Sequence, residues 1–174
     1  MEGKKLWSVL VLLAGWGLGI ATSSITLSMT RRFEKRDVAR VLLPEVQSNH
    51  SRAEVFARVN ERLLSGQQLK DERGNPLPDF SQAELLPGSF GFATFDATLG
   101  RQGYFDRDLL EALHAFYGLL RQAEQFREAA ASANASRCPD LRTGLLKNVF
   151  ESAAEAAKVA QEKNIARRLE ETAR

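Results

Sequence analysis

Residues 6–30, LWSVLVLLAGWGLGIATSSITLSMT, contain no charged side chain and lie between Lys4-Lys5 and Arg31-Arg32. A helix rises about 1.5 Å per residue, so this stretch forms a helix about 37 Å long. That length is enough to cross a hydrocarbon core of about 30 Å with some tilt. We therefore predict a single transmembrane helix over residues 6–30, after a short N-terminal tail at residues 1–5.

A cleavable signal peptide is the rival interpretation of the same stretch. Lys4-Lys5, the apolar run and the small residues around Ala21 imitate its basic, apolar and cleavage regions. Two features oppose it, because the uncharged stretch continues past Ala21 and a dense positive cluster follows, which disfavours translocation. We favour the uncleaved anchor and keep an exported protein with a cleaved signal peptide as an alternative.

The positive cluster, here called the basic cluster, follows the apolar stretch directly; it consists of Arg31, Arg32, Lys35, Arg36 and Arg40. Lys and Arg concentrate on the cytoplasmic side of membrane helices, so this bias predicts a cytoplasmic soluble domain. Two lysines before the span also allow the opposite orientation. Basic side chains beside a membrane attract anionic headgroups, and we expect the cluster to lie at the lipid surface.

A stripe of small residues runs along the predicted span. Gly15 and Gly19 have the G-x-x-x-G spacing that lets two membrane helices approach closely, and Ser23 continues the stripe by one turn. Glycine is also common in membrane helices that do not pair, and this interpretation stays open. The stripe predicts helix pairing, either with another membrane protein or with a second copy of the chain.

Residues 31–174 have the length of one domain, and their apolar spacing predicts an all-α fold of three to four antiparallel helices. The membrane helix is expected to run on into a one-sided helix at residues 31–65. Pro44 is expected to bend or restart that helix, with Glu45 in the new first turn. Asn49 and Asn60 fall close to the apolar stripe, where they either fix helix pairing from a buried position or lie in water at its edge.

Helix and loop signals divide the rest of the chain. The Gly, Asn and Pro content at about residues 66–80 predicts a loop. Ser89 is the expected N-cap of a brief helix, and Asp106 is the expected N-cap of the longest soluble helix. A final helix is predicted from about residue 140 to 172, with alanines along its apolar stripe that allow close packing.

Neither the composition nor the sequence motifs indicate nucleic-acid binding, metal binding or catalysis. The 24 basic and 22 acidic residues give no reason to expect nucleic acid binding. Cys138 is the single cysteine, and His50 and His114 lie far apart, so we expect neither a metal nor a cofactor. The common phosphate-binding, hydrolase and metalloprotease motifs are absent from the sequence. We predict that the protein is not an enzyme.

A loose family resemblance rests on three sets of residues. Leu43, Glu45 and Asn49 fit a Leu-x-Glu-x-x-x-Asn pattern, Phe95-Asp96-Ala97 forms an aromatic turn, and the Phe-Tyr-x-x-Leu core has the members Phe116, Tyr117 and Leu120. The chain resembles uncharacterised bacterial small single-pass membrane proteins with a helical soluble domain. The resemblance implies a membrane anchor in the bacterial inner membrane and lends no activity.

These observations favour a membrane-anchored scaffold or accessory subunit that acts through protein-protein contacts. Its expected partners are the lipid bilayer and a membrane protein, or a second copy, bound through the transmembrane helix. The alternative is a small-molecule sensor, because helical bundles hold ligands between helices. A sensor of this kind would signal through a partner.

Overall fold

The computed structural model describes residues 2–64, 89–132 and 139–174, without the side chains of residues 2–15, 17–21, 63–64 and 139–140. Every regular element in these ranges is a helix, which confirms the all-α prediction. The loop predicted at about residues 66–80 lies outside the described residues, as does Cys138.

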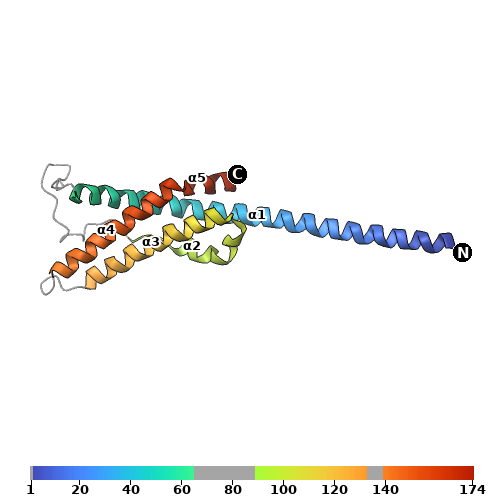
Figure 1. Ribbon diagram of the computed structural model, residues 1–174, viewed down its shortest axis with the longest axis horizontal. Coiled ribbons are helices and arrows are strands. Elements are labelled where there is room, and N and C mark those ends of the chain that lie inside the picture. Colours follow the sequence, from blue (N-terminus) through green and yellow to red (C-terminus); the bar gives the residue numbers. More distant parts are fainter. Residues whose placement is uncertain (1, 65–88, 133–138) are drawn as a thin grey trace.

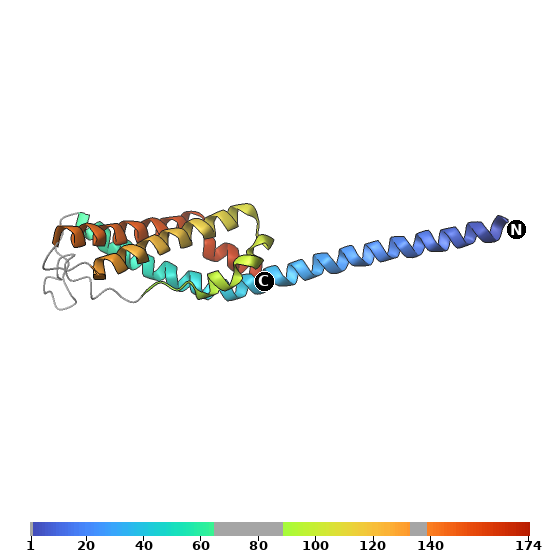
Figure 2. The same cartoon turned by 90° about the horizontal axis from the view of Figure 1, so that it is seen from below.

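The first helix, α1 (Glu2–Leu64), dominates the molecule. It contains 63 residues, which corresponds to about 95 Å. Figures 1 and 2 show its N-terminal half extending away from all other helices and its C-terminal half packed among them. We call residues 2–33 of α1 the rod and the remaining packed helices the bundle. The sequence predicted that the helix at residues 6–30 continues into the helix at residues 31–65. The backbone of α1 confirms this continuity.

Pro44 does not restart the helix, so that part of the prediction is wrong. Alpha-helical structure continues through it, because Pro44 lies on the exposed face of α1, where water can bond the carbonyl that proline leaves free. Leu42 and Val46 on the opposite face are fully buried and hold both turns against the bundle. Figure 2 shows the axis of α1 turning in its cyan part, where the rod gives way to the bundle, consistent with a proline bend.

Three further helices complete the bundle: α3 (Arg107–Ser132), α4 (Pro139–Glu162) and α5 (Ile165–Ala173). Helix α4 runs antiparallel to α1 and to α3 (Figure 1). The rings of Phe56 on α1 and Phe150 on α4 are 5.5 Å apart, and nearer the rod Arg40 Nε of α1 donates to the Ala173 carbonyl of α5 at 3.2 Å. Helices α1 and α3 run in the same direction, since residues 89–106 lead the chain back along α1 before α3 begins. The predicted antiparallel packing therefore applies to α4 and α5 against α1 but not to the pair α1 and α3.

The core is formed where α1, α3 and α4 meet. Its side chains are mostly large on α3 and small on α4, where alanines allow a close approach, as the sequence predicted. The fully buried residues of this core include Val38, Leu42, Val46, Phe56, Leu109, Leu113, Phe116, Leu120, Ala153 and Ala156.

The final helix is broken, whereas the sequence predicted one helix from about 140 to 172. Asn164 lies between α4 and α5 in the left-handed conformation, with φ 49° and ψ 43°. Asparagine tolerates this conformation better than most residues. The break redirects the chain so that Ile165 and Leu169 of α5 become fully buried against the bundle.

Among the residues described with their side chains, no helix is both long enough and apolar enough to cross a bilayer. The transmembrane helix predicted at residues 6–30 is not confirmed by this finding. Most of its side chains lie outside the description.

Candidate functional site at the junction of rod and bundle

The segment between α1 and α3 contains two short helices, α2 (Ala93–Thr98) and the 3-10 helix η2 (Leu99–Tyr104). Glu45 of α1 caps α2, because its carboxylate accepts hydrogen bonds from the N–H groups of Thr94 at 2.8 Å and Phe95 at 3.0 Å. Ser89 was the predicted N-cap, and this prediction is wrong. Ser89 lies before the helix, and its carbonyl accepts a hydrogen bond from Arg52. A carboxylate at a helix N-terminus is also favoured by the helix dipole.

Asn49 attaches the same segment one turn further along α1. Its Nδ2 donates to the Gly91 carbonyl at 2.6 Å, and its Oδ1 accepts from the Gly91 N–H at 2.9 Å. Asn49 and Asn60 are both buried, so the interpretation that placed them in water at the edge of the stripe is wrong. Only Asn49 has a side-chain role that the structure explains, because Asn60 Oδ1 has no partner among the described residues.

Tyr117 of α3 closes this polar cluster from the other side. Its hydroxyl donates to Glu45 Oε1 at 2.8 Å, and its ring stacks on Phe95 with centroids 3.9 Å apart. Burial raises the pKa of the Tyr117 phenol far above its ordinary value, and the hydrogen bond to the Glu45 carboxylate adds to the shift. We call Glu45, Asn49, Gly91, Phe95 and Tyr117 the polar cluster. Its members lock α1, α2 and α3 together.

The polar cluster positions η2 along α1. Gln102 is almost fully buried, and its Nε2 donates to the Phe95 carbonyl at 3.2 Å and to Thr98 Oγ1 at 3.1 Å. These bonds fold the 3-10 turn back onto α2. As a result, Gly103 and Tyr104 lie against α1 where the rod meets the bundle, beside Arg31, Arg32 and Lys35.

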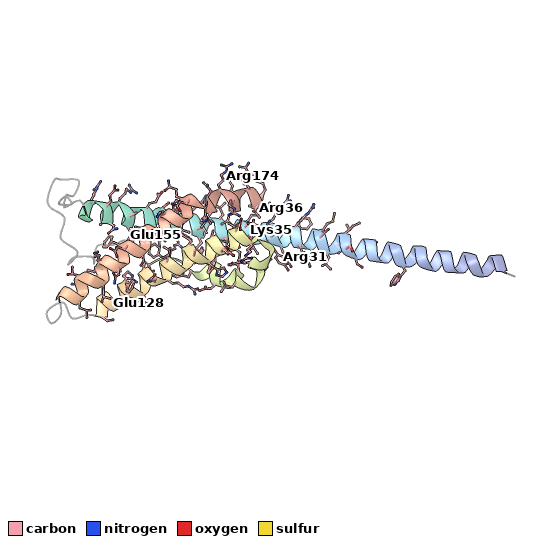
Figure 3. The ribbon with its side chains drawn as sticks, in the orientation of Figure 1. Arg31, Lys35, Arg36, Glu128, Glu155 and Arg174 are labelled. Atoms are coloured by element: carbon pink, nitrogen blue, oxygen red, sulfur yellow. The ribbon has the colours of Figure 1, made fainter. Side chains whose placement is uncertain are left out.

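The basic cluster lies at this junction (Figure 3). Arg31, Arg32, Arg36 and Arg40 are exposed, and Lys35 is half-buried. Figure 3 shows Arg31 and Arg36 on different sides of α1, and at about 3.6 residues per turn the five positions spread over about half of the helix circumference. Arg40 is the member that also contacts the bundle, through its bond to Ala173.

Three members of the basic cluster share a hollow with η2. Arg31, Arg32 and Lys35 line one side of this space of about 450 Å³, and Gly103 and Tyr104 line the other. We call it the junction hollow. The sequence predicted the cationic side and missed the η2 side, because nothing local indicates that residues 103 and 104 return to α1.

Glu34 of α1 holds Tyr104 in place. The hydrogen bond between the Tyr104 hydroxyl and the Glu34 carboxylate raises the pKa of the phenol, and the negative charge of Glu34 acts in the same direction. Tyr104 is partly exposed and therefore stands at the edge of the hollow. No local pattern pointed to Glu34, which lies between Arg31 and Arg40 together with a second acid, Asp37.

Asp106 stabilises the start of α3 beside the junction, as predicted. Its Oδ1 accepts the Leu109 N–H at 2.9 Å and pairs with Arg168 of α5. Partial burial raises the pKa of the Asp106 carboxyl, but the Leu109 hydrogen bond and the charges of Arg168 and Lys35 outweigh it. The net pKa lies below the ordinary value of 3.8.

The predicted pairing residues Gly15, Gly19 and Ser23 all belong to the rod. The surroundings of the two glycines lie outside the described residues, whereas Ser23 is exposed. The helical backbone places these positions one turn apart, and the role in pairing stays a prediction.

In the ranges that the structure describes, no three His, Cys, Asp or Glu side chains gather as metal ligands. A smaller hollow of about 230 Å³ lies between α1, α4 and α5 and includes His50, Asn164 and Arg167 in its lining. Within the polar cluster, both Glu45 oxygens accept hydrogen bonds from other residues of the fold.

Comparison with family models, with curated proteins and with solved structures finds no match to this chain.

Proposed function

We propose that the protein is a membrane-anchored helical scaffold or accessory subunit, with its rod in a bacterial inner membrane and its bundle at the surface. One observation carries the proposal: α1 continues out of the bundle, and residues 6–30 of this part carry no charge. Residues 22–33 are all exposed, and Trp16 is 74% exposed. Apolar surface left in water costs about 25 cal/mol per Å², which a bilayer would remove.

The position of the basic cluster also supports this proposal. Its first members follow directly after residue 30, where the uncharged stretch ends and the bundle begins. A membrane surface attracts each nearby Lys or Arg by about 1 kcal/mol when it carries anionic lipids. The cluster is therefore well placed to hold the bundle against the headgroups.

The polar groups inside the bundle favour a protein that acts by binding a partner over one that catalyses a reaction. Glu45, Asn49, Gln102 and Tyr117 all bond to the backbone or to one another and thus hold the fold together. The bundle leaves single large apolar residues exposed, such as Val41 and Leu141, which are 51% and 58% exposed. We propose that a partner protein contacts the bundle or pairs with the rod.

Membrane flotation and alkaline extraction of the full chain test the anchor. We expect the protein to float with vesicles and to resist extraction, because the rod would be embedded in lipid. Val11→Arg with Leu18→Arg should release it, since an arginine near the centre of a span costs about 2.5 to 3.5 kcal/mol. The matched control, Ala115→Arg with Gln122→Arg, adds the same charge to the exposed face of α3 and should stay membrane-bound.

Two results would contradict the proposal. The first is full-length, unmodified protein that is released by alkaline treatment like a peripheral protein. The second is a soluble product that begins near residue 21, which would support the cleaved signal peptide.

We further propose that the bundle lies in the cytoplasm, because five basic residues follow the uncharged stretch 6–30 and two lysines precede it. A fluorescent protein fused to the C-terminus should fluoresce, whereas alkaline phosphatase fused there should be inactive. Active phosphatase at that position would place the bundle on the opposite side.

A further inference from the structure

The junction hollow combines cationic side chains with an open backbone position. Arg31, Arg32 and Lys35 line it, and a Cβ atom added to Gly103 would meet no atom within 4 Å. We propose that this hollow binds the phosphate headgroup of a single anionic phospholipid, an inference that rests on the membrane anchor proposed above. It assigns a defined binding site where the sequence predicted only a general attraction to the membrane surface.

The two sides of the hollow come from elements that the fold fixes in place. The polar cluster and the buried Gln102 bring η2 against α1, and Tyr104 on η2 interacts with Glu34 beside the hollow. Within the described part of the chain, Arg31 and Arg32 form no ion pair. The described lining of the hollow contains three cations and no carboxylate, so the hollow is positive, which favours a phosphate.

A second hollow explains why the phosphate should belong to a lipid. It adjoins the first through Arg31 and Tyr104 and continues down the rod, lined by Thr26, Leu27 and Thr30 among others. Thr26 and Thr30 donate their hydroxyls to carbonyls one turn earlier in α1, at 2.9 and 3.0 Å. Because these hydroxyls are already satisfied, the two threonines can present their methyl groups to an acyl chain beside Leu27, whereas Arg31, Glu34 and Tyr104 line the polar end of the groove nearest the junction hollow.

Native mass spectrometry of the full chain in mild detergent tests the proposal, with phosphatidylglycerol and phosphatidylcholine as probes. We expect one phosphatidylglycerol to stay bound and phosphatidylcholine to be lost. Arg32→Gln with Lys35→Gln should weaken phosphatidylglycerol binding about thirtyfold, from two charges worth about 1 kcal/mol each at a membrane surface. Lys147→Gln with Lys158→Gln removes two exposed charges from α4 and should change nothing.

A pair of uncharged variants separates the shape of the hollow from its charge. Gly103→Phe places a ring in the hollow and should abolish lipid retention. Gly100→Phe adds the same ring to η2 at a position equally free of neighbours that does not line the hollow, and it should bind lipid like the parent protein. Circular dichroism would verify that both variants keep the helical content of the parent.

Four outcomes would overturn the inference. Equal retention of the two lipids would show that the hollow does not select a negative charge. Loss of binding in the α4 variant as well would reduce the effect to net charge. Displacement of the lipid by soluble glycerol phosphate would assign the hollow to a free phosphate compound. A chain that floats with vesicles but retains no lipid contradicts this inference alone, whereas a chain that fails to float contradicts the anchor.

Discussion

Glu45 is the residue whose surroundings do most to define the bundle. Its carboxylate accepts two backbone N–H groups at the start of α2 and the hydroxyl of Tyr117 on α3. One side chain of α1 thus joins two other helices through residues that are 49 to 72 positions away in the sequence. Donors that lose such an acceptor inside the fold are left without hydrogen bonds, which costs far more than one exposed interaction.

We expect Glu45→Ala to lower the free energy of unfolding by about 3 kcal/mol, because it leaves three donors without their acceptor. Tyr117→Phe removes one of these bonds and should cost about 1 kcal/mol. Chemical denaturation of the detergent-solubilised protein, followed by circular dichroism, would measure both. Glu61→Ala, an exposed site on the same helix, is the control. Equal effects at residues 45 and 61 would contradict the role given to Glu45.

Asp106 makes a pH-dependent contribution to the free energy of unfolding. The sign of this contribution follows from the lowered pKa of its carboxyl. A carboxyl with a depressed folded-state pKa stabilises the fold above its unfolded pKa, and this stabilisation is lost as the pH falls through the folded pKa. Asp106→Asn keeps a capping oxygen and removes the charge that pairs with Arg168. It should be less stable than the parent at neutral pH, and the difference should shrink below about pH 3.8. Urea unfolding at both pH values checks this, and a constant difference would contradict it.

At the scale of the elements, local signals predicted what depends on local contacts. The spacing of Leu109, Leu113 and Phe116 predicted α3, and Asp106 caps it through a bond three residues away. The start of α2 was not predictable in this way, since its capping carboxylate lies on another helix. The same holds for the junction hollow, because η2 reaches the rod only after the polar cluster has folded the chain back.

The helix break at Asn164 was not predicted from the sequence. Helix-forming residues lie on both sides of Asn164 and predicted one continuous helix, whereas the structure ends α4 before it and begins α5 after it. The positive φ of Asn164 favours glycine or asparagine. Asn164→Gly should therefore be nearly neutral, whereas Asn164→Ala should lower stability by about 1 kcal/mol. Thermal unfolding of the two variants side by side measures the difference. A more stable alanine variant would mean that α4 and α5 prefer to form one helix.

Helix pairing through the rod is also a property of a single element, because it depends on which residues lie on one face of α1. If Gly15 and Gly19 face a second membrane helix, replacing both by leucine should prevent close approach and abolish self-association or partner binding. Ala14→Leu with Gly17→Leu adds leucines on the opposite side of the helix and should leave association unchanged. Chemical cross-linking in membranes measures both variants. If both pairs of changes behave like the parent, the glycines are not a pairing surface.

At the scale of the whole molecule, the two halves of α1 have opposite surroundings. The C-terminal half is buried among α3, α4 and α5, and the rod extends beyond them into surroundings that no described element provides. The basic cluster and η2 lie at the boundary between the two (Figure 3). This division is the physical basis for the anchor, for the lipid site at the junction and for a bundle that acts through contact.

The depth of the rod in a bilayer tests this account most directly. Nitroxide labels at single cysteines, introduced at Leu10, Leu18, Thr26, Arg36 and Glu111 in a Cys138→Ser background, would be compared for collision with oxygen and with a water-soluble nickel complex. We expect oxygen access to peak near position 18 and nickel access to dominate at positions 36 and 111. Nickel access that is equally high at all five positions would place the rod in water and contradict the account.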